Sequence, residues 1–280
     1  MPHRRACAYC DSTQNLTREH VIPKFVCEQE RLKGNTPQIW NAYTEQGDKA
    51  VAGEVTIADV CADCNNGPLS SLDSYGAQLW NKFFDRVPRP GEKVIFTYEF
   101  DLLLRWLLKL TYNAGRSRHW REGLLSVLHA YREYIIGKCG RPNRVRIYLQ
   151  LITPEKLSSK DQQQLLADTG FVGDELPPEI RRFAVFVGEG IDAGFLVGLN
   201  GYQFYLVFWS ANLERIQLVA GERAFMKMIK GSKSLPPESS RIVTFASSMS
   251  ILDVARSNPI LRRNIARGVS YMQQRNRRRR

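Results

Sequence analysis

The chain has 280 residues, 43% of them apolar, so it is long enough and apolar enough to bury a core, which excludes wholesale disorder. Its 40 Lys and Arg against 28 Asp and Glu give a net charge of +12, which favours a polyanionic partner, either nucleic acid or an anionic membrane surface. No stretch offers the ~18 uninterrupted apolar residues of a membrane span, and no apolar core follows the basic N-terminus. We therefore expect no membrane association and a cytoplasmic protein, in which six cysteines favour metal binding or buried thiols over disulfides.

The first part of the chain carries two cysteine pairs, short strand-like runs and many turn formers. It ends in a cluster of Pro and Gly over residues 87–91, which is typical of a domain boundary. Before that boundary, residues 69–84 form a helix-like run. We therefore expect an N-terminal domain over residues 1–90.

The part that follows, residues 91–255, has both helical and β patterns. Apolar spacing predicts packed helices over 100–113, 120–136 and 221–229, and a further helix over 248–274 that extends beyond this part. β-Branched and aromatic runs predict strands over 145–152, 183–188, 193–199, 202–209 and 215–220, with Asn200-Gly201 as a two-residue turn that requires positive φ at both positions. These patterns predict an α+β fold: an antiparallel sheet with flanking helices. We assign its aromatic strands to a core rather than to a base-stacking platform.

The tail over residues 256–280 contains nine arginines and no acidic residue. Two interpretations stay open. Like charges at a chain end are commonly solvated and disordered, whereas a basic arm that contacts phosphates would add affinity for nucleic acid without sequence specificity.

Two C-x-x-C pairs, Cys7/Cys10 and Cys61/Cys64, stand 50 residues apart, counted between the nearest cysteines. Each pair lets a tight turn present two thiolates, and two such knuckles complete a closed tetrahedral site. The alternative is a pair of redox or buried thiols, but a redox pair belongs at the strand-to-helix junction of a βαβ unit, and neither pair has that context. The spacing therefore predicts structural Zn²⁺.

The stretch TREHVIPKF, residues 17–25, places Glu19 beside His20 between the knuckles, and Asn65 directly follows the second knuckle. This order resembles the HNH endonucleases of the ββα-metal (His-Me finger) class over roughly residues 5–85. The resemblance implies a zinc-stabilised ββα-metal domain. In it, His20 is the general base, Glu19 and Asn65 hold one divalent cation, and the four cysteines bind zinc.

Phosphodiester hydrolysis agrees with those roles, because it needs a base for the attacking water and a cation at the scissile phosphate. Oxygen ligands such as Glu19 and Asn65 suit Mg²⁺ or Mn²⁺. Neighbouring side chains on a strand point to opposite faces, so we expect a twisted or bulged strand end at Glu19 and His20.

The sequence departs from the family pattern in three places. Glutamate stands at Glu19, where aspartate is common. The family's loop-steadying asparagine has no counterpart over residues 55–60, where Thr56 or Asp59 could substitute. Finally, 40 residues separate His20 from Cys61, which predicts an inserted loop over residues 27–53 that carries Arg31 and Lys33 as candidate DNA contacts.

The leading hypothesis is a metal-dependent endonuclease that cuts double-stranded DNA. A catalytically silent zinc-finger adaptor that binds nucleic acid, and a nuclease directed at RNA, are the alternatives. Arg18 and Lys24 flank the Glu-His pair as candidate phosphate contacts or plain solvated charges, and Asn66 is a rival to Asn65 as metal ligand.

Overall fold

A computed structural model describes residues 6–32, 38–40, 50–52, 55–117, 122–160, 162–163, 173–176 and 181–247 of the chain. The basic tail over 256–280 and the helix expected over 248–274 lie outside these residues. Lys33 does as well, and nothing is described of the Arg31 side chain.

The N-terminal part pairs two strands that are distant in sequence and follows them with a long helical segment. Strand β1 (Leu16–His20) pairs antiparallel with β4 (Thr56–Cys61). Helix α1 (Lys24–Leu32) begins directly after Pro23, a residue that is compatible with the first turn of a helix. The short strands β2 (Gln38–Trp40) and β3 (Ala50–Ala52) pair with each other.

The helical segment starts at the second cysteine pair. It runs through α2 (Ala62–Cys64), a π-type turn η1 (Asn65–Leu69), α3 (Ser70–Leu79) and a second π-type turn η2 (Trp80–Phe84). Gly67 has non-helical dihedrals and Pro68 follows it, so the segment bends there. The helix expected over residues 69–84 is confirmed, and it begins earlier than expected.

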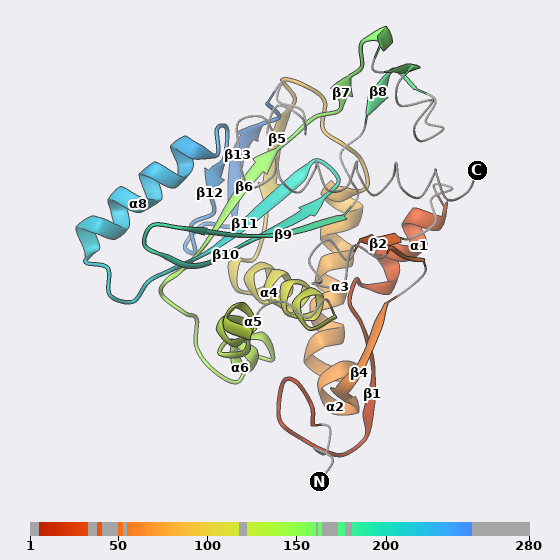
Figure 1. Ribbon diagram of the computed structural model, residues 1–280, viewed down its shortest axis with the longest axis vertical. Coiled ribbons are helices and arrows are strands. Elements are labelled where there is room, and N and C mark those ends of the chain that lie inside the picture. The colour runs from red at the N-terminus through yellow and green to blue at the C-terminus, as the bar shows by residue number, and fades with distance from the viewer. Residues whose placement is uncertain are drawn as a thin grey trace.

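A five-stranded antiparallel sheet forms the centre of the molecule, in the order β12-β6-β11-β10-β9 (Figure 1). A second, two-stranded sheet joins β5 to β13, and β7 pairs with β8. The bounds are β5 (Lys93–Thr97), β6 (Val145–Leu151), β7 (Glu155–Lys156), β8 (Glu175–Leu176), β9 (Arg181–Gly188), β10 (Ile191–Leu199), β11 (Tyr202–Trp209), β12 (Lys233–Ser234) and β13 (Arg241–Phe245).

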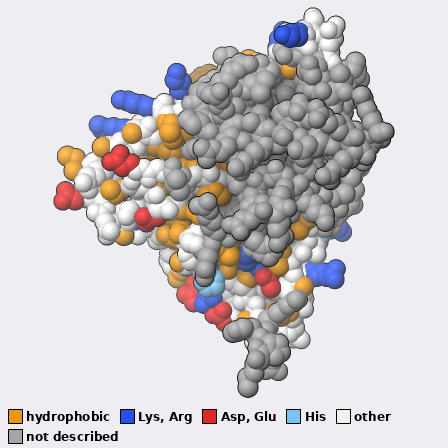
Figure 2. All heavy atoms as spheres, in the orientation of Figure 1, with side chains coloured by type: hydrophobic (Ala, Val, Ile, Leu, Met, Phe, Trp, Pro, Cys, Tyr) orange, Lys and Arg blue, Asp and Glu red, His pale blue; other side chains and the backbone are white. Residues whose placement is uncertain are grey.

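Helices cover both faces of this sheet. Helix α8 (Arg215–Met228) packs Phe225 onto one face, against Tyr148 and Phe186. The other face meets α4 (Phe100–Ser117) and α5 (Glu122–His129), and α6 (Arg132–Ile135) packs against α4 (Figure 1). The outer side of the molecule at α8 carries both hydrophobic and charged side chains (Figure 2). This arrangement is the α+β fold with an antiparallel sheet that the sequence predicts.

Three local predictions are wrong. The helix expected over residues 120–136 is two helices, α5 and α6, separated by a turn at Ala130 and Tyr131. The strand expected over 215–220 is the start of α8. Asn200 takes φ +51° as expected, but Gly201 is not among the described glycines with positive φ. A glycine is required there because a Cβ would lie 2.5 Å from the Ile152 carbonyl oxygen.

One hydrophobic core extends from Cys7 to Ala246 and crosses the Pro/Gly cluster at residues 87–91 without a break. Helix α4 lies at its centre, and Leu103, Trp106 and Leu107 are fully buried. The N-terminal part therefore shares its core with the rest of the molecule, and the division into domains at residue 90 stays a prediction. Within the described residues, no helix has the length and apolar character needed to cross a membrane.

Candidate metal centre and catalytic residues

The two C-x-x-C pairs come together in space. The sulfurs of Cys7, Cys10, Cys61 and Cys64 all lie within 4.8 Å of one another, and Cys10 Sγ is 3.5 Å from Cys61 Sγ. The second pair is placed by the end of β4 and by α2, whose Ala62 N–H donates to the Asn15 carbonyl. Four converging sulfurs with no open position are the donor set of a structural metal ion such as zinc.

The surroundings of Cys7 favour the thiolate that a metal requires. Burial by itself raises the pKa of this thiol, but hydrogen bonds from the backbone at Cys61, Tyr9 and Cys10 outweigh it and lower the pKa to about 7. Burial raises the pKa of the Cys64 thiol, which therefore gains most from a bound cation. The four residues fit a metal ion in their geometry and in the chemistry of their sulfur donors.

The pairing of β1 with β4 shifts register between Thr17 and Glu19, whereas Glu19 and His20 themselves pair regularly with Ile57 and Thr56, so the bulge expected at Glu19 and His20 is not found on their strand. Thr17 faces Val60 across the sheet, whereas Glu19 faces Ile57, so one residue of β1 is opposite two of β4. This is a β-bulge whose extra residue belongs to β4, and it increases the local twist of the strand pair directly before Glu19. Glu19 is buried and the side chain of His20 is partly exposed.

Asn65 lies against the same strand. Its Nδ2 donates to Thr17 Oγ1 at 2.9 Å and to the Arg18 carbonyl at 3.1 Å. The first residue after the second knuckle is thereby held beside the residues that precede Glu19. No hydrogen bond joins Asn65 to Glu19 within the described part of the chain, and Asn65 Oδ1 is the atom left for a further ligand.

The Glu19 carboxylate belongs to a buried ionic cluster. Lys109 Nζ, on α4, lies 2.8 Å from Glu19 Oε1 and 2.6 Å from Asp73 Oδ2, on α3. Lys109 is completely buried and Glu19 is 4% exposed. Burial raises the pKa of the Asp73 carboxyl, although the Lys109 ammonium acts in the opposite direction. An ammonium therefore already neutralises Glu19 Oε1, and it competes with any divalent cation for that oxygen.

A second polar contact from α4 reaches the end of β1. Asn113 Nδ2 donates to the His20 carbonyl at 3.1 Å and to Glu19 Oε1 at 3.3 Å. Its Oδ1 accepts from Tyr9 Oη at 2.7 Å and from Arg116 Nη2 at 2.6 Å. Asn113 thus connects the first cysteine pair to the Glu-His pair.

The other predicted site residues have less specific surroundings. Arg18 is exposed on β1, and Lys24, at the start of α1, lies 3.5 Å from Glu28. Thr56 faces His20 across the sheet. Asp59 accepts a hydrogen bond from Arg116 at 2.6 Å, so its carboxylate is directed at α4 rather than at the loop it was expected to steady.

Sequence reasoning missed the contribution of α4. Lys109, Asn113 and Arg116 recur at i, i+4 and i+7 in a helix whose remaining residues are largely Leu, Trp and other apolar types, so they share one face. Polar residues with that spacing in an apolar helix indicate a buried polar contact, and this signal was available. Their partners, Tyr9, Glu19 and Asp59, could not be identified without the tertiary structure.

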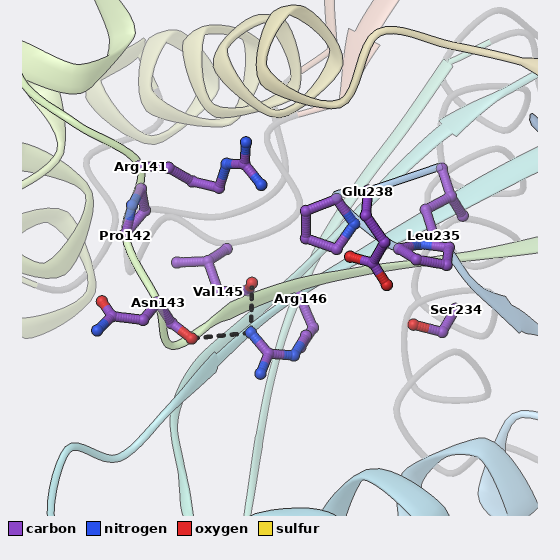
Figure 3. Close-up of a pocket in the computed structure, with 10 residues that line it drawn as sticks. Arg141, Pro142, Asn143, Val145, Arg146, Ser234, Leu235 and Glu238 are labelled. Carbon is purple, nitrogen blue, oxygen red and sulfur yellow. Dashed lines mark hydrogen bonds between the residues drawn. The ribbon is translucent and has the colours of Figure 1, made fainter. Parts of the chain in front are cut away.

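A cavity of about 580 Å³ lies elsewhere, lined by Arg141, Arg146, Glu238 and residues near them (Figure 3). Arg146 Nη1 donates to the backbone carbonyls of Asn143 and Val145, and its Nε lies 2.7 Å from Glu222. Arg141 is paired with Asp101. Because the charges of both arginines are already compensated, the cavity has no strong preference for an anion.

Comparison with protein-family models, with curated proteins and with solved structures finds no match for this chain.

Proposed function

We propose that the chain is a metal-dependent endonuclease of the HNH type that hydrolyses phosphodiester bonds in DNA. The observation that carries the proposal is the contact of Asn65 with β1, because it packs the segment after the second cysteine pair against the strand that ends in Glu19 and His20. Two antiparallel strands followed by a helix, next to four clustered cysteines, are what the resemblance implies.

In this proposal His20 is the general base. It stands at the end of β1 as a half-buried residue, where a water molecule bound to substrate would have to reach it. The four cysteines would hold zinc and fix the turn that carries Asn65, while taking no part in the chemistry.

A divalent cation at the phosphate would supply charge neutralisation. Asn65 Oδ1 and Glu19 Oε2 are the oxygens that would hold Mg²⁺ or Mn²⁺, since Lys109 and Asn113 both contact Glu19 Oε1. The fit is better at Asn65 than at Glu19, whose charge is shared with the Lys109 ammonium.

The positive charge of the chain supports a nucleic-acid substrate. The net charge of +12 favours a polyanion, and the exposed Arg18 lies next to Glu19 on β1. An RNA-directed nuclease and a silent adaptor would also attract nucleic acid through this charge. Cleavage assays with DNA and with RNA therefore distinguish the DNA nuclease, the RNA nuclease and the adaptor.

The test is incubation of the purified protein with supercoiled plasmid and with single-stranded RNA, each with added Mg²⁺, with added Mn²⁺ and with neither. Cations are withheld rather than chelated, because a chelator would also remove zinc. The proposal expects plasmid nicking only with an added cation. Cleavage of RNA but not of DNA would change the proposed substrate from DNA to RNA. Binding of nucleic acid without cleavage of either substrate would favour the adaptor.

Asn65→Ala is the matching variant, with Asn66→Ala as control, because Asn66 is the exposed neighbour of the same residue type. We expect cleavage to fall at least about 100-fold in Asn65→Ala and to change less than about twofold in the control. Equal losses in both variants would contradict the assignment of Asn65.

A further inference from the structure

The Asn113 side chain uses its entire hydrogen-bonding capacity on groups around the Glu-His pair. A side-chain amide has two N–H donors and an oxygen with two lone pairs. Both donors go to β1, at the His20 carbonyl and Glu19 Oε1, and both acceptor positions are taken, by Tyr9 Oη and Arg116 Nη2. Asn113 is fully buried, so no water is needed to complete this set.

The two donated hydrogen bonds act on consecutive residues. One fixes the carbonyl of His20, and with it the peptide that ends β1, and the other fixes the carboxylate of Glu19. The two accepted bonds hold the amide plane against the first cysteine pair, through Tyr9, and against β4, through the Arg116–Asp59 ion pair. The amide cannot rotate without breaking contacts on every side.

We propose that Asn113 is the positioning residue of the His20 base, supplied by helix α4 from outside the segment that resembles the nuclease family. This inference rests on the proposed nuclease function. Catalysis by a positioned base depends steeply on geometry, and a displacement of about 1 Å can cost about 100-fold in rate. Asn113 touches no reacting atom; it acts through the backbone of His20.

The substitution that isolates this role is Asn113→Asp. It conserves shape and both accepted hydrogen bonds, but it replaces two donors with a carboxylate oxygen facing the His20 carbonyl and the Glu19 carboxylate. We expect bound zinc to stay at the wild-type level and KM for plasmid to change less than about threefold. The same variant should lose about 10- to 100-fold in kcat.

The split between kcat and KM separates positioning from a general loss of structure. A positioning role predicts a lower kcat at a nearly unchanged KM in protein that is folded and loaded with zinc. A variant that is merely less stable would lose kcat only in proportion to its unfolded fraction.

Gln150→Glu is the matched control. Gln150 is a buried side-chain amide in β6 whose Oε1 accepts from Tyr205 Oη at 2.8 Å and whose Nε2 donates to the Lys230 carbonyl at 2.7 Å. It makes the same kinds of contact in the central sheet, so the same amide-to-acid change has a comparable cost in stability without touching the site. We expect it to leave kcat and KM unchanged.

Each outcome is decisive. If the wild type cuts and Asn113→Asp behaves like Gln150→Glu, the positioning role is overturned while the nuclease stands. If the wild type cuts no nucleic acid, the proposed function fails and the inference with it. If Asn113→Asp does not fold, Asn113→Ser takes its place, because its shorter hydroxyl loses both donors to β1; kcat equal to the wild type would again overturn the role.

Discussion

Lys109 is the residue at which charge and burial conflict most directly. Its ammonium group is completely buried between the Glu19 and Asp73 carboxylates, and it also approaches the Leu69 carbonyl at 3.4 Å. A buried charge is tolerated only when partners compensate it, and removing one partner leaves the others unpaired. This cluster therefore ties α4, α3 and β1 together through charge as well as through packing.

Replacement of Lys109 by Met, which has a similar volume, should destabilise the protein by about 3–5 kcal/mol, because the buried Glu19 carboxylate and the partly buried Asp73 carboxylate lose their counter-ion. Urea unfolding of the variant measures this. The exposed lysine that contacts Thr97 provides the control: Lys82→Met should change the unfolding free energy by less than about 0.5 kcal/mol. Adding Glu19→Gln to Lys109→Met should recover part of the lost unfolding free energy. Equal stability of Lys109→Met and the wild type would show that the ionic cluster of Lys109, Glu19 and Asp73 does not stabilise the fold.

Glu92 makes a pH-dependent contribution to the free energy of unfolding. The Arg86 guanidinium and the Arg89 backbone N–H lower the pKa of this carboxyl from 4.5 to about 2. A lowered pKa in the folded state means that the stabilisation is complete above about pH 4.5 and is lost as the pH falls toward 2. Because the Arg86–Glu92 ion pair is partly exposed, we expect it to stabilise the folded protein by about 0.5–1 kcal/mol. Acid unfolding should show wild type and Glu92→Gln converging below about pH 2; a constant difference between them would contradict the assignment.

At the scale of single residues, the sequence predicted the cysteine cluster better than the surroundings of Glu19. The spacing of Cys7, Cys10, Cys61 and Cys64 implies a shared ion directly, because each knuckle is a local motif. The environment of Glu19 depends on Lys109 and Asn113, about 90 residues away, and local patterns contain no information on such a contact.

Helix α8 shows why local patterns failed at one element. Residues 215–220 contain β-branched types and were expected to form a strand, yet they begin a helix. Glu214 and Gln217 form a capping box, in which Gln217 Oε1 accepts from the Glu214 N–H at 2.9 Å. This start signal, together with packing of Phe225 on the sheet, outweighs β-propensity, which depends strongly on context.

The capping box can be tested directly. Gln217→Ala removes the acceptor for the Glu214 N–H and should lower the unfolding free energy by about 0.5–1 kcal/mol, as measured by thermal or urea unfolding. Arg223→Ala, at an exposed position in the middle of the same helix, is the control and should be close to neutral. Indistinguishable effects of the two substitutions would mean that the cap contributes nothing.

The strands of the central sheet were predictable because they are runs rich in β-branched and aromatic residues. In β6 and β11 successive residues join the cores on opposite faces of the sheet, so both faces of these strands are buried and their sequences are nearly continuous apolar runs. The short strands β5, β12 and β13 were missed. Strands β5 and β13 pair with each other across nearly 150 residues of sequence, and only the tertiary fold brings them together.

On the scale of the whole molecule, the cysteine cluster borders a core that is continuous from Cys7 to Ala246. Loss of the metal should therefore destabilise the whole chain rather than release a separate domain. We expect Cys64→Ser to reduce bound zinc from about one per chain to near zero and to lower the unfolding free energy by several kcal/mol.

Cys139→Ser is the control for this prediction, because Cys139 is an exposed cysteine away from the cluster. It should keep both zinc and stability, as measured by elemental analysis and calorimetry. A variant Cys64→Ser that unfolds in two separate steps would contradict the shared core, and one that keeps its zinc would contradict the four-cysteine site.

Cleavage of supercoiled plasmid by the wild-type protein and by His20→Ala decides whether the protein is a nuclease with His20 as its base; both reactions contain equal protein and the same divalent cation, and the zinc content of both proteins is measured. We expect the wild type to nick the plasmid and the variant, with zinc and fold intact, to be slower by at least about 100-fold. Equal cleavage by both proteins would contradict the role of His20, and no cleavage by either, with full zinc occupancy and bound DNA, would contradict the nuclease.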